Sequence, residues 1–368
     1  MRFNGDGKFT IMQIADTQEI PEVSPDTLRL IEAALDRARP DLVVFTGDQI
    51  KGDSFKFKGR DSAERVKKCI ESLISPLKKR SVPFALTFGN HDEQAMPKEE
   101  QLEIYRGAGD CVNPASGAPN PGTFNITVSG KGSENPVFNL YIIDSGGGAS
   151  GGWAEAVGED ITGWYRETRE ALFERTGSYV PSLVFQHIPV PEYYDALKRV
   201  DKKHKGAVRA YRTHKNEYYV LNENTKGPGD FFGESPAIPD NNCGQFDALR
   251  EKGEVLGIWV GHDHINSYKT KLRGIDLGYT QGCGFNIYGP GIKRGVRVFE
   301  LDENDPRNYK THTLTFEELC GNKVEKPLKN FMYSHIPTTA DQAISMGVRA
   351  LLVAGAAVAG AVILAKIL

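Results

Sequence analysis

The sequence has few cysteines and no spacing that would pair them. Five cysteines are spread over 368 residues, an odd number, and none stands in a Cys-x-x-Cys pair. Such a set excludes a disulfide framework and gives no support to a thiolate zinc site. We therefore expect reduced thiols in a cytosolic protein.

The chain also lacks an excess of charge of one sign. Lysine and arginine total 45 against 48 aspartates and glutamates, a net charge of −3, which gives no general attraction to nucleic acid. The sequence also has no basic stripe interleaved with aromatic residues, the pattern typical of proteins that follow a single strand. We expect no nucleic-acid partner, so a charged substrate would have to be bound by a local site.

A long apolar run is missing at the amino end and present at the carboxyl end. The first ten residues contain no segment typical of a secretory signal. Residues 346–368, in contrast, predict a terminal helix, in which residues 350–365 are all small or apolar between Arg349 and Lys366. Sixteen helical residues cover about 24 Å of a hydrocarbon layer of roughly 30 Å, and the flanking basic residues can snorkel.

Two interpretations of this terminal helix stay open. It could cross a membrane and tail-anchor a cytoplasmic catalytic domain, or it could dock on the protein or on a second subunit through its small residues. Membrane fractionation with and without residues 346–368 would separate the two. The oligomeric state is left open.

The first third of the chain predicts an α/β fold. Apolar runs at residues 9–15, 41–45 and 82–88 indicate buried strands, and the helical spacing of residues 24–39 and 62–75 indicates amphipathic helices. Pro76 is expected at the end of the second helix. Because ligands bind at the carboxyl ends of strands in open α/β sheets, the polar residues that follow these strands are expected to converge.

The later part of the chain predicts fewer helices. The segments "TFNITVSG" and "VFNLYIID" indicate an antiparallel pair, a helix is expected around residues 160–175, and two further strands end in histidines. Residues 202–241 are long and polar and predict a surface excursion, of the kind that forms lids or binding loops. Because the composition does not change within residues 1–318, these residues are expected to form one catalytic domain. Residues 319–345 are expected to be a linker to the terminal helix.

Five polar clusters, each at the end of an apolar strand pattern, carry the chemistry. They are Asp16, the pair Gly47-Asp48, "GNHD" at residues 89–92, the pair Gln186-His187, and "GHDH" at residues 261–264. Carboxylates, an amide and imidazoles together suit two divalent ions of the zinc, manganese or iron kind. Residues two apart on an extended segment face the same side, so His262 and His264 can reach neighbouring ions while Asp263 points away.

Any one of these clusters could be a simple turn, but their order and combination resemble the calcineurin-like metallophosphoesterase superfamily, in the branch related to the purple acid phosphatases. The resemblance covers about residues 8–301 and includes "LVFQHIPVPEYYDAL", "DNNCGQFDAL" and "GHDHINSY". It implies a four-layer sandwich of two packed mixed β-sheets flanked by helices. It also implies that Asp48 bridges two ions, that Asp16 and His264 bind the first ion, that Asn90, His187 and His262 bind the second, and that His91 is the catalytic histidine.

Two positions depart from the family pattern. Gln18 stands where the family has a histidine ligand, and an amide oxygen is a weaker and harder donor, so the first ion is either loosely held, completed by water, or selected toward Mn²⁺, Mg²⁺ or Fe²⁺ over Zn²⁺. Lys51 stands where the purple enzymes have an iron-binding tyrosine. A purple tyrosinate–iron site is therefore not expected.

The resemblance predicts an enzyme that hydrolyses phosphoesters, most readily phosphomonoesters of small molecules or proteins, by in-line attack of a hydroxide held between the ions. A phosphodiesterase with the same site is an alternative, and a catalytically weak metal-binding regulatory or scaffold protein is an alternative of another class. Asp92 is interpreted either as a residue that orients His91 or as a structural acid. Lys293 and Arg294, in a glycine-rich loop, are candidates for binding phosphate or for simple solvated charges.

Overall fold

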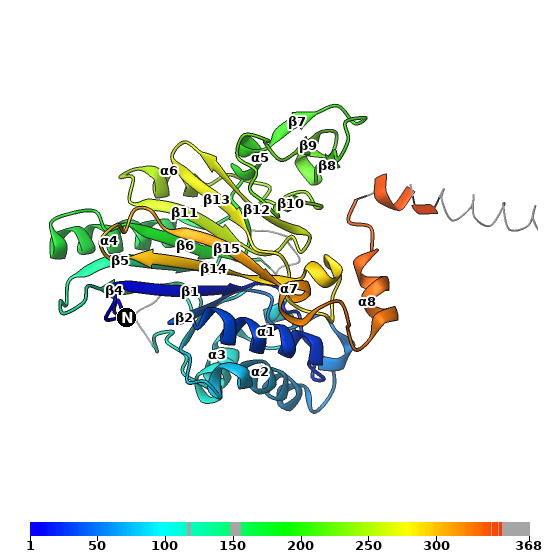
Figure 1. The fold of residues 1–368 in the computed structure, drawn as a ribbon, viewed down its shortest axis with the longest axis horizontal. Coiled ribbons are helices and arrows are strands. Elements are labelled where there is room, and N and C mark those ends of the chain that lie inside the picture. Colours follow the sequence, from blue (N-terminus) through cyan, green and yellow to red (C-terminus); the bar gives the residue numbers. More distant parts are fainter. Residues whose placement is uncertain (116–118, 148–155, 340, 345, 348–368) are drawn as a thin grey trace, which may run out of the picture.

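Two mixed β-sheets face each other at the centre of the protein, with helices outside both of them (Figure 1). The computed structural model describes residues 1–115, 119–147, 156–339, 341–344 and 346–347. The five-stranded sheet has the order β15-β14-β1-β2-β3, and the seven-stranded sheet has the order β10-β12-β13-β11-β6-β5-β4. This arrangement confirms the mixed α/β fold with two packed sheets.

The strands of the five-stranded sheet are β1 (Lys8–Ile14), β2 (Leu42–Thr46), β3 (Phe84–Thr87), β14 (Gly295–Asp302) and β15 (Lys310–Thr315). The strands of the seven-stranded sheet are β4 (Phe124–Ser129), β5 (Pro136–Ile143), β6 (Ser182–Gln186), β10 (Phe231–Phe232), β11 (Val255–Val260), β12 (Asn266–Leu272) and β13 (Ile275–Tyr279). In the first sheet β1, β2 and β3 run parallel, and in the second β5, β6, β11 and β13 run parallel. The predicted hairpin is confirmed as β4 and β5, which pair antiparallel.

Alternation along the strands distributes apolar residues between separate cores. Ile11 of β1 and Val44 of β2 point into the core between the two sheets, whereas their neighbours Met12 and Val43 point into the core beneath the helices. Successive side chains of a strand face opposite sides, so a continuous apolar run fits a sheet that is covered on both faces. This coverage of both faces explains the continuous apolar runs from which the buried strands were predicted.

The helices cover the outer face of each sheet. The five-stranded sheet is covered by α1 (Pro25–Ala38), α2 (Ser62–Lys78) and α3 (Lys98–Ala108), and the seven-stranded sheet by α4 (Glu159–Thr176), α5 (Tyr193–Ala196) and α6 (Gln245–Arg250). The expected end of α2 at Pro76 is wrong, since the helix continues to Lys78 with Pro76 inside it. Pro76 is buried, so its ring contributes to packing in the last turn, where one missing N–H costs less than in mid-helix.

Residues 202–241 form a small structure of their own at the edge of the seven-stranded sheet. Within this excursion lie β8 (Val208–Arg209) and β9 (Tyr218–Val220), which form a three-stranded sheet with β7 (Lys198–Val200). Further along, β10 pairs with β12 and so joins the excursion to the large sheet. The excursion is thus ordered and anchored at both ends.

The segment after residue 318 lies against the catalytic body. Beyond α7 (Phe316–Cys320) it contains α8 (Pro327–Ser334), and Lys329 of α8 donates a hydrogen bond to Asn286. In the described part of the chain, no helix is long and apolar enough to cross a membrane. The terminal helix expected over residues 346–368 lies, from residue 348 on, outside the described residues, so its membrane or docking role stays a prediction.

Candidate metal centre

The predicted site residues converge at the carboxyl ends of parallel strands from both sheets. Asp16 and Asp48 each come two residues after the end of their strands, β1 and β2, and Asn90 follows β3. From the other sheet, His187 directly follows β6, and His262 and His264 follow β11. A bridge between Ala15 and Gly282 joins the two sheets at this edge. The strand ends therefore bring all six predicted ligands together, as open α/β sheets do with their ligand sites.

The backbone at the site is held in an unusual conformation. Asp16, Gln18, Asp48 and His262 have φ values of 50°, 35°, 53° and 73°, in the left-handed region that non-glycine residues rarely occupy. Each turns the chain sharply after a strand and aims a side chain along the sheet edge. Such conformations cost on the order of 1–3 kcal/mol each and persist where the surrounding structure imposes them.

Two glycines allow the carboxylates to lie close against the neighbouring loops. A Cβ atom on Gly89 would lie 2.2 Å from Oδ1 of Asp48, and a Cβ atom on Gly261 would lie 2.4 Å from Oδ2 of Asp16. No larger residue fits either position unless the carboxylate moves. The glycines of the "GNH" and "GHDH" patterns are thus explained by close approach.

One group of ligand atoms surrounds Nε2 of His187. That atom lies 3.1 Å from Oδ1 of Asn90, 3.4 Å from Oδ2 of Asp48 and 3.1 Å from Nδ1 of His262. Ligands bound tetrahedrally to an ion at about 2.0–2.2 Å are roughly 3.3–3.6 Å apart. Nε2 of His187 therefore lies at nearly that distance from each of the other three atoms, and the donor set of carboxylate, amide oxygen and imidazole suits a divalent ion.

A second group contains Asp16, Asp48 and His264, whose ligand atoms all lie within 4.8 Å of one another. Oδ2 of Asp16 accepts a hydrogen bond from the backbone N–H of His262 at 2.9 Å, whereas Oδ1 is buried and has no hydrogen-bond partner among the described residues. A buried carboxylate oxygen without a donor is strongly unfavourable unless a cation neutralises it. This atom is the observation that most directly fits a bound metal ion.

Gln18 lies beside this second group but presents a donor to it. Its Nε2 donates to Oδ2 of Asp48 at 2.7 Å and lies 3.5 Å from Nε2 of His264. An amide nitrogen has no lone pair to offer a metal ion. In this arrangement Gln18 supports the carboxylate that both groups share.

Backbone carbonyl groups determine which ring nitrogen of His187 and of His264 faces the site. Nδ1 of His187 donates to the carbonyl oxygen of Thr46 at 2.9 Å, and Nδ1 of His264 donates to the carbonyl oxygen of Tyr288 at 3.0 Å. In both rings Nε2 then faces the site, which is the usual orientation of a metal-binding histidine. The ring of Tyr288 also stacks on His264 at 4.2 Å between centroids.

The pKa values of the carboxylates and histidines in the site are shifted by burial and by one another's charges. Burial lowers the pKa of His187, but the carboxylates of Asp48 and Asp16 outweigh burial and raise it to about 10. Burial and the neighbouring His187 keep the pKa of His262 well below its ordinary value. For Asp48, burial alone would raise the pKa, yet His187 and His91 lower it. The carboxylate is thus held ionised, as a bridging ligand must be.

Asp92 is a structural acid in this geometry. Its carboxylate accepts hydrogen bonds from the backbone N–H groups of Asp48 at 2.8 Å, Gly89 at 2.8 Å and Ile50 at 3.1 Å. These contacts tie the loop after β2 to the loop after β3. Of the two interpretations given to Asp92, the geometry favours the structural one over contact with the His91 ring.

His91 stands at the wall of the pocket. Its backbone N–H donates to Oδ1 of Asp48 at 2.8 Å, and its Nδ1 is 3.2 Å from Oε1 of Gln94. Donation to Gln94 leaves Nε2 of His91 available to the pocket. Burial lowers the pKa of His91, but the nearby Asp48 carboxylate outweighs burial, so the pKa is raised above its ordinary value.

The two candidate phosphate-binding residues lie elsewhere. The guanidinium of Arg294 is buried and donates to the backbone carbonyls of Gly284, Ile287 and Tyr288, so it braces the loop that holds His264. Lys293 lines a different cavity. Neither residue lines the pocket over the metal centre, and the geometry gives no support to a phosphate-binding role there.

That pocket has a volume of about 380 Å³ and includes residues that the sequence patterns did not indicate. From the excursion come Tyr211, Glu234, Ser235 and Ala237; from the C-terminal segment comes Thr338; and from the body come Lys51, Asp53, Asp263, Ile287 and Tyr288. Asp263 points away from the ligand atoms, as expected, and accepts from Tyr279 and from the N–H of Ala237. Lys51 and Asp53 follow Asp48 closely in the sequence, whereas the residues of the excursion and Thr338 reach the site through contacts distant in sequence, which no local pattern signals.

The two-sheet fold and the buried carboxylate and histidine group define a metallophosphoesterase. Residues 9–266 match the family described as calcineurin-like phosphoesterase, and the chain belongs to that family. It is accordingly a phosphoester hydrolase by class, with a divalent metal centre as the family's cofactor.

Relatives of known sequence and structure agree with this assignment. The chain is 27% identical over 343 residues to "Probable inactive purple acid phosphatase 14" of Arabidopsis thaliana, covering 82% of this chain and 77% of the relative. It is 27% identical over 344 residues to "Phosphatase DCR2" of Saccharomyces cerevisiae, covering 82% of this chain but 52% of that protein. A dimetal phosphatase from Danio rerio shares the fold, with a TM-score of 0.50 at 15% identity over 84% of this chain and 99% of that structure.

Replacing Gly89 by alanine should disrupt the site without unfolding the protein. The new Cβ atom would collide with Oδ1 of Asp48, and overpacking of this kind costs about 1–3 kcal/mol. We expect a metal content at least tenfold lower after dialysis, measured by elemental analysis. In the control Gly107→Ala the new Cβ atom meets nothing within 4 Å, so metal content should be unchanged; a Gly89→Ala protein with normal metal content would contradict the explanation.

Proposed function

We propose that this protein hydrolyses phosphomonoesters of small molecules at a centre of two divalent ions, of Mn, Fe or Zn. The proposed ligands are Asp16, Asp48 and His264 for the first ion and Asp48, Asn90, His187 and His262 for the second. The observation that carries the proposal is the position of Asp48, whose carboxylate borders both groups of ligand atoms. Oδ1 of Asp16 supports the first of the two sites, because it is buried, has no hydrogen-bond partner among the described residues and lies 3.4 Å from Nε2 of His264.

Two divalent ions bound there would activate a water molecule and offset the charge of the phosphoryl group. The residues of the chain supply the remaining functions. The His91 ring, oriented by Gln94, presents Nε2 to the pocket and can donate a proton to the leaving oxygen. The carbonyls of Thr46 and Tyr288 keep the His187 and His264 rings in the orientation that binding requires.

The volume of the pocket supports a compact substrate. A volume of about 380 Å³ is within the range of small-molecule sites. The excursion of residues 202–241 forms one wall and is proposed to act as the lid of a catalytic domain that spans residues 1–318. A phosphorylated protein loop would have to displace this wall to reach the ions.

The C-terminal segment holds the lid in place. Asp341 accepts a hydrogen bond from the hydroxyl of Tyr218 at 2.6 Å and forms ion pairs with Lys202 at 3.4 Å and Arg209 at 3.6 Å. Thr338, on the same segment, lines the pocket and donates to the carbonyl oxygen of Gly233 at 3.4 Å. Thr338 and Asp341 therefore act together as a strap, and we propose that the strap limits the size of substrate that can enter.

Two alternatives keep specific support. A phosphodiesterase would use the same centre, and the pocket chemistry is compatible with either ester. A catalytically weak metal-binding protein is favoured by Gln18, which offers a donor where the family pattern has a histidine, and by the printed names of the plant relatives, which call them probable inactive phosphatases. These alternatives differ in turnover, so kinetics separate them.

The main test is ester hydrolysis by metal-free protein supplied with Mn²⁺, Fe²⁺ or Zn²⁺. We expect turnover of para-nitrophenyl phosphate to exceed that of its bis ester, and Asp48→Asn to lower kcat at least 100-fold because it removes the shared carboxylate. Absence of turnover of either ester with every metal would support the regulatory alternative. Faster turnover of the bis ester would support the phosphodiesterase.

Gln18→His should strengthen the first ion site. An imidazole supplies the lone pair that the Gln18 amide nitrogen lacks, so we expect at least tenfold tighter binding of one of two Zn²⁺ ions and a higher kcat with Zn²⁺. Metal titration by calorimetry measures the first effect. Gln18→Asn is the matched control and should not tighten binding. An unchanged titration in Gln18→His would show that this position is not next to an ion.

Asp341→Ala should release the strap. Each of its contacts is partly exposed and worth at most about 1 kcal/mol, so the fold should be retained while the lid loosens. We expect kcat/KM for a phosphoserine peptide to rise at least threefold relative to that for para-nitrophenyl phosphate. The control Asp61→Ala removes an exposed acid at the start of α2, which covers the five-stranded sheet and not the lid. An unchanged ratio of the two substrates would argue against a strap that limits size.

A further inference from the structure

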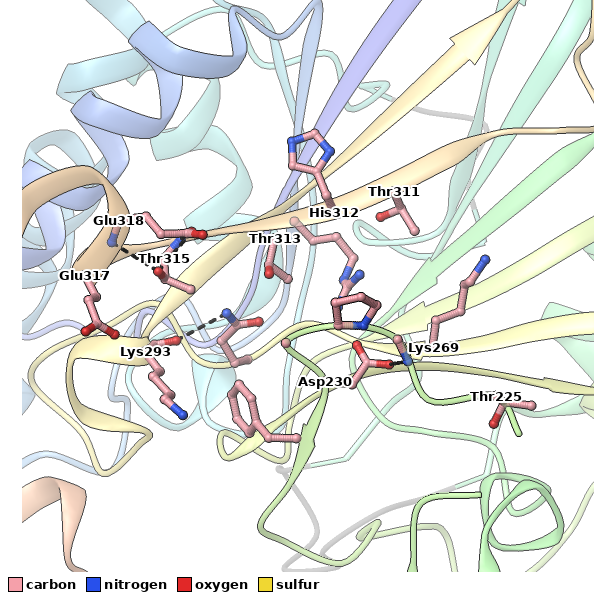
Figure 2. A pocket seen from close by; sticks show the side chains of 16 residues that line it. Thr225, Asp230, Lys269, Lys293, Thr311, His312, Thr313, Thr315, Glu317 and Glu318 are labelled. Atoms are coloured by element: carbon pink, nitrogen blue, oxygen red, sulfur yellow. Dashed lines mark hydrogen bonds between the residues drawn. The ribbon is translucent and has the colours of Figure 1, made fainter. Parts of the chain in front are cut away.

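A second and larger cavity lies where the excursion meets the open edge of the five-stranded sheet. Its volume is about 660 Å³, and among the described residues none that line it also lines the pocket over the metal centre. Figure 2 shows Thr311, Thr313 and Thr315 in a row along β15, with Lys293 and Lys269 on opposite sides of the cavity. The row arises because alternate residues of a strand face the same side.

Buried polar atoms at the floor of this cavity have unused hydrogen-bonding capacity. Gln281 is fully buried; its Nε2 donates to the carbonyl of Lys293, but its Oε1 has no partner in the described structure. Arg297 is 3% exposed and donates to Ser267 and to the carbonyl of Tyr279, while its Nε has no partner there either. Unsatisfied buried groups are rare in folded proteins, and here they line a cavity of ligand size.

The cavity is lined by three cations, Lys269, Lys293 and Arg297, and by three acids, Asp230, Glu317 and Glu318. Two of the cations form no ion pair in the described chain, although the charge of Asp230 acts on Arg297. Burial lowers the pKa of Arg297 to about 10, so the guanidinium is still charged at neutral pH, yet Arg297 belongs to none of the ion pairs of the described residues. Lys293 likewise has no carboxylate within ion-pair distance in the described chain, and its Nζ lies 6.0 Å from the ring centroid of Phe231. Arginine and lysine that face a cavity in this way suit an anionic group.

Other side chains that line the cavity can form hydrogen bonds with hydroxyl groups of a ligand. Oε1 of Gln281 can accept, and the Asp230 carboxylate, which accepts from the backbone N–H groups of Gly227 and Lys269, can accept further donors through its remaining lone pairs. The hydroxyl of Thr311 has no partner within the described residues and can donate or accept. A bare inorganic anion would leave these acceptors unused and would lie near the Asp230 carboxylate.

We propose that this cavity is a binding site for a small hydroxylated anion of the size of a sugar phosphate or sugar acid. The anionic group would lie against Lys293, Arg297 and the threonine row, and the hydroxyl groups would donate to Gln281 and Asp230. The site is separate from the metal centre and does not require the proposed hydrolysis.

The test uses two probes of this class and two controls. The phosphonate analogue of glucose 6-phosphate, which cannot be hydrolysed, and gluconate are titrated into the full-length protein by calorimetry, beside glucose and inorganic phosphate. We use Asp48→Asn as the background because it removes the carboxylate shared by both proposed ion sites. Saturable binding of the phosphonate or of gluconate should persist in Asp48→Asn and exceed that of glucose and phosphate at least fivefold, and the stronger probe identifies the anionic group.

Variants of the lining decide where the probe binds. Lys293 is exposed at the surface, so Lys293→Gln should fold normally and weaken binding at least fivefold in the Asp48→Asn background; Thr313→Val should weaken it as well. Lys310→Gln, on the same strand but outside the lining, should leave binding unchanged. Loss of all binding in Asp48→Asn, equal binding in Lys293→Gln, or equal binding of glucose would each overturn the proposal.

Discussion

The candidate site depends on one buried carboxylate that binds no substrate. Asp92 accepts three backbone N–H groups from two loops and so fixes the turn that carries Asp48 and the glycine that lies against it. Burial and the adjacent Asp48 raise the pKa of Asp92 to about 7, and the N–H donors act against this increase. Two acids this close repel each other in a poorly solvated site. Cations bound to Asp48 would relieve that repulsion, which links metal binding to the stability of the strand ends.

Hydrogen bonds of the surrounding loops also explain why residues with strained backbone conformations are concentrated at the site. Asp16, Gln18, Asp48 and His262 account for four of the eight non-glycine residues with positive φ in the described chain. Each conformation is unfavourable by itself, and each is held by hydrogen bonds: the N–H of Gln18 to the carbonyl of Asp48, and the N–H of His262 to Asp16. The sandwich therefore holds these residues in position through its own hydrogen bonds, and a preorganised site loses less free energy on binding.

The sequence predicted the parts of this site that follow strands. Asp16, Asp48, Asn90 and His187 lie at the ends of apolar runs, and the geometry of parallel sheets brings such ends together whatever lies between them. Residues whose role depends on distant contacts could not be predicted. Arg294 was a candidate for phosphate, but its guanidinium is used by three carbonyls of the loop at residues 284–288.

The contacts of the segment after residue 318 left no sequence signal for a related reason. Residues 319–345, predicted to be a linker, are polar and weakly patterned, yet Lys329 of α8 donates to Asn286 and Thr338 lines the pocket over the candidate metal centre. Pro76 was expected to end a helix, and tertiary packing of the last turn overrides that local preference. Local patterns encode strands and helices, whereas single long-range hydrogen bonds, such as that from Tyr218 to Asp341, leave no periodic trace.

Gln18 shows how such a fold can change its chemistry without changing its shape. The amide donates to Asp48, so it satisfies the same carboxylate that an ion would neutralise, and the strand end keeps its conformation either way. Loss of one ligand therefore leaves no unsatisfied group at this position, in contrast to the loss of Asp48 or Asp92. With glutamine at this position the scaffold keeps the other side chains of the site in place, because Gln18 donates to Asp48. Under the proposed two-ion arrangement, the affinity of the first ion rather than the scaffold would then decide the catalytic strength.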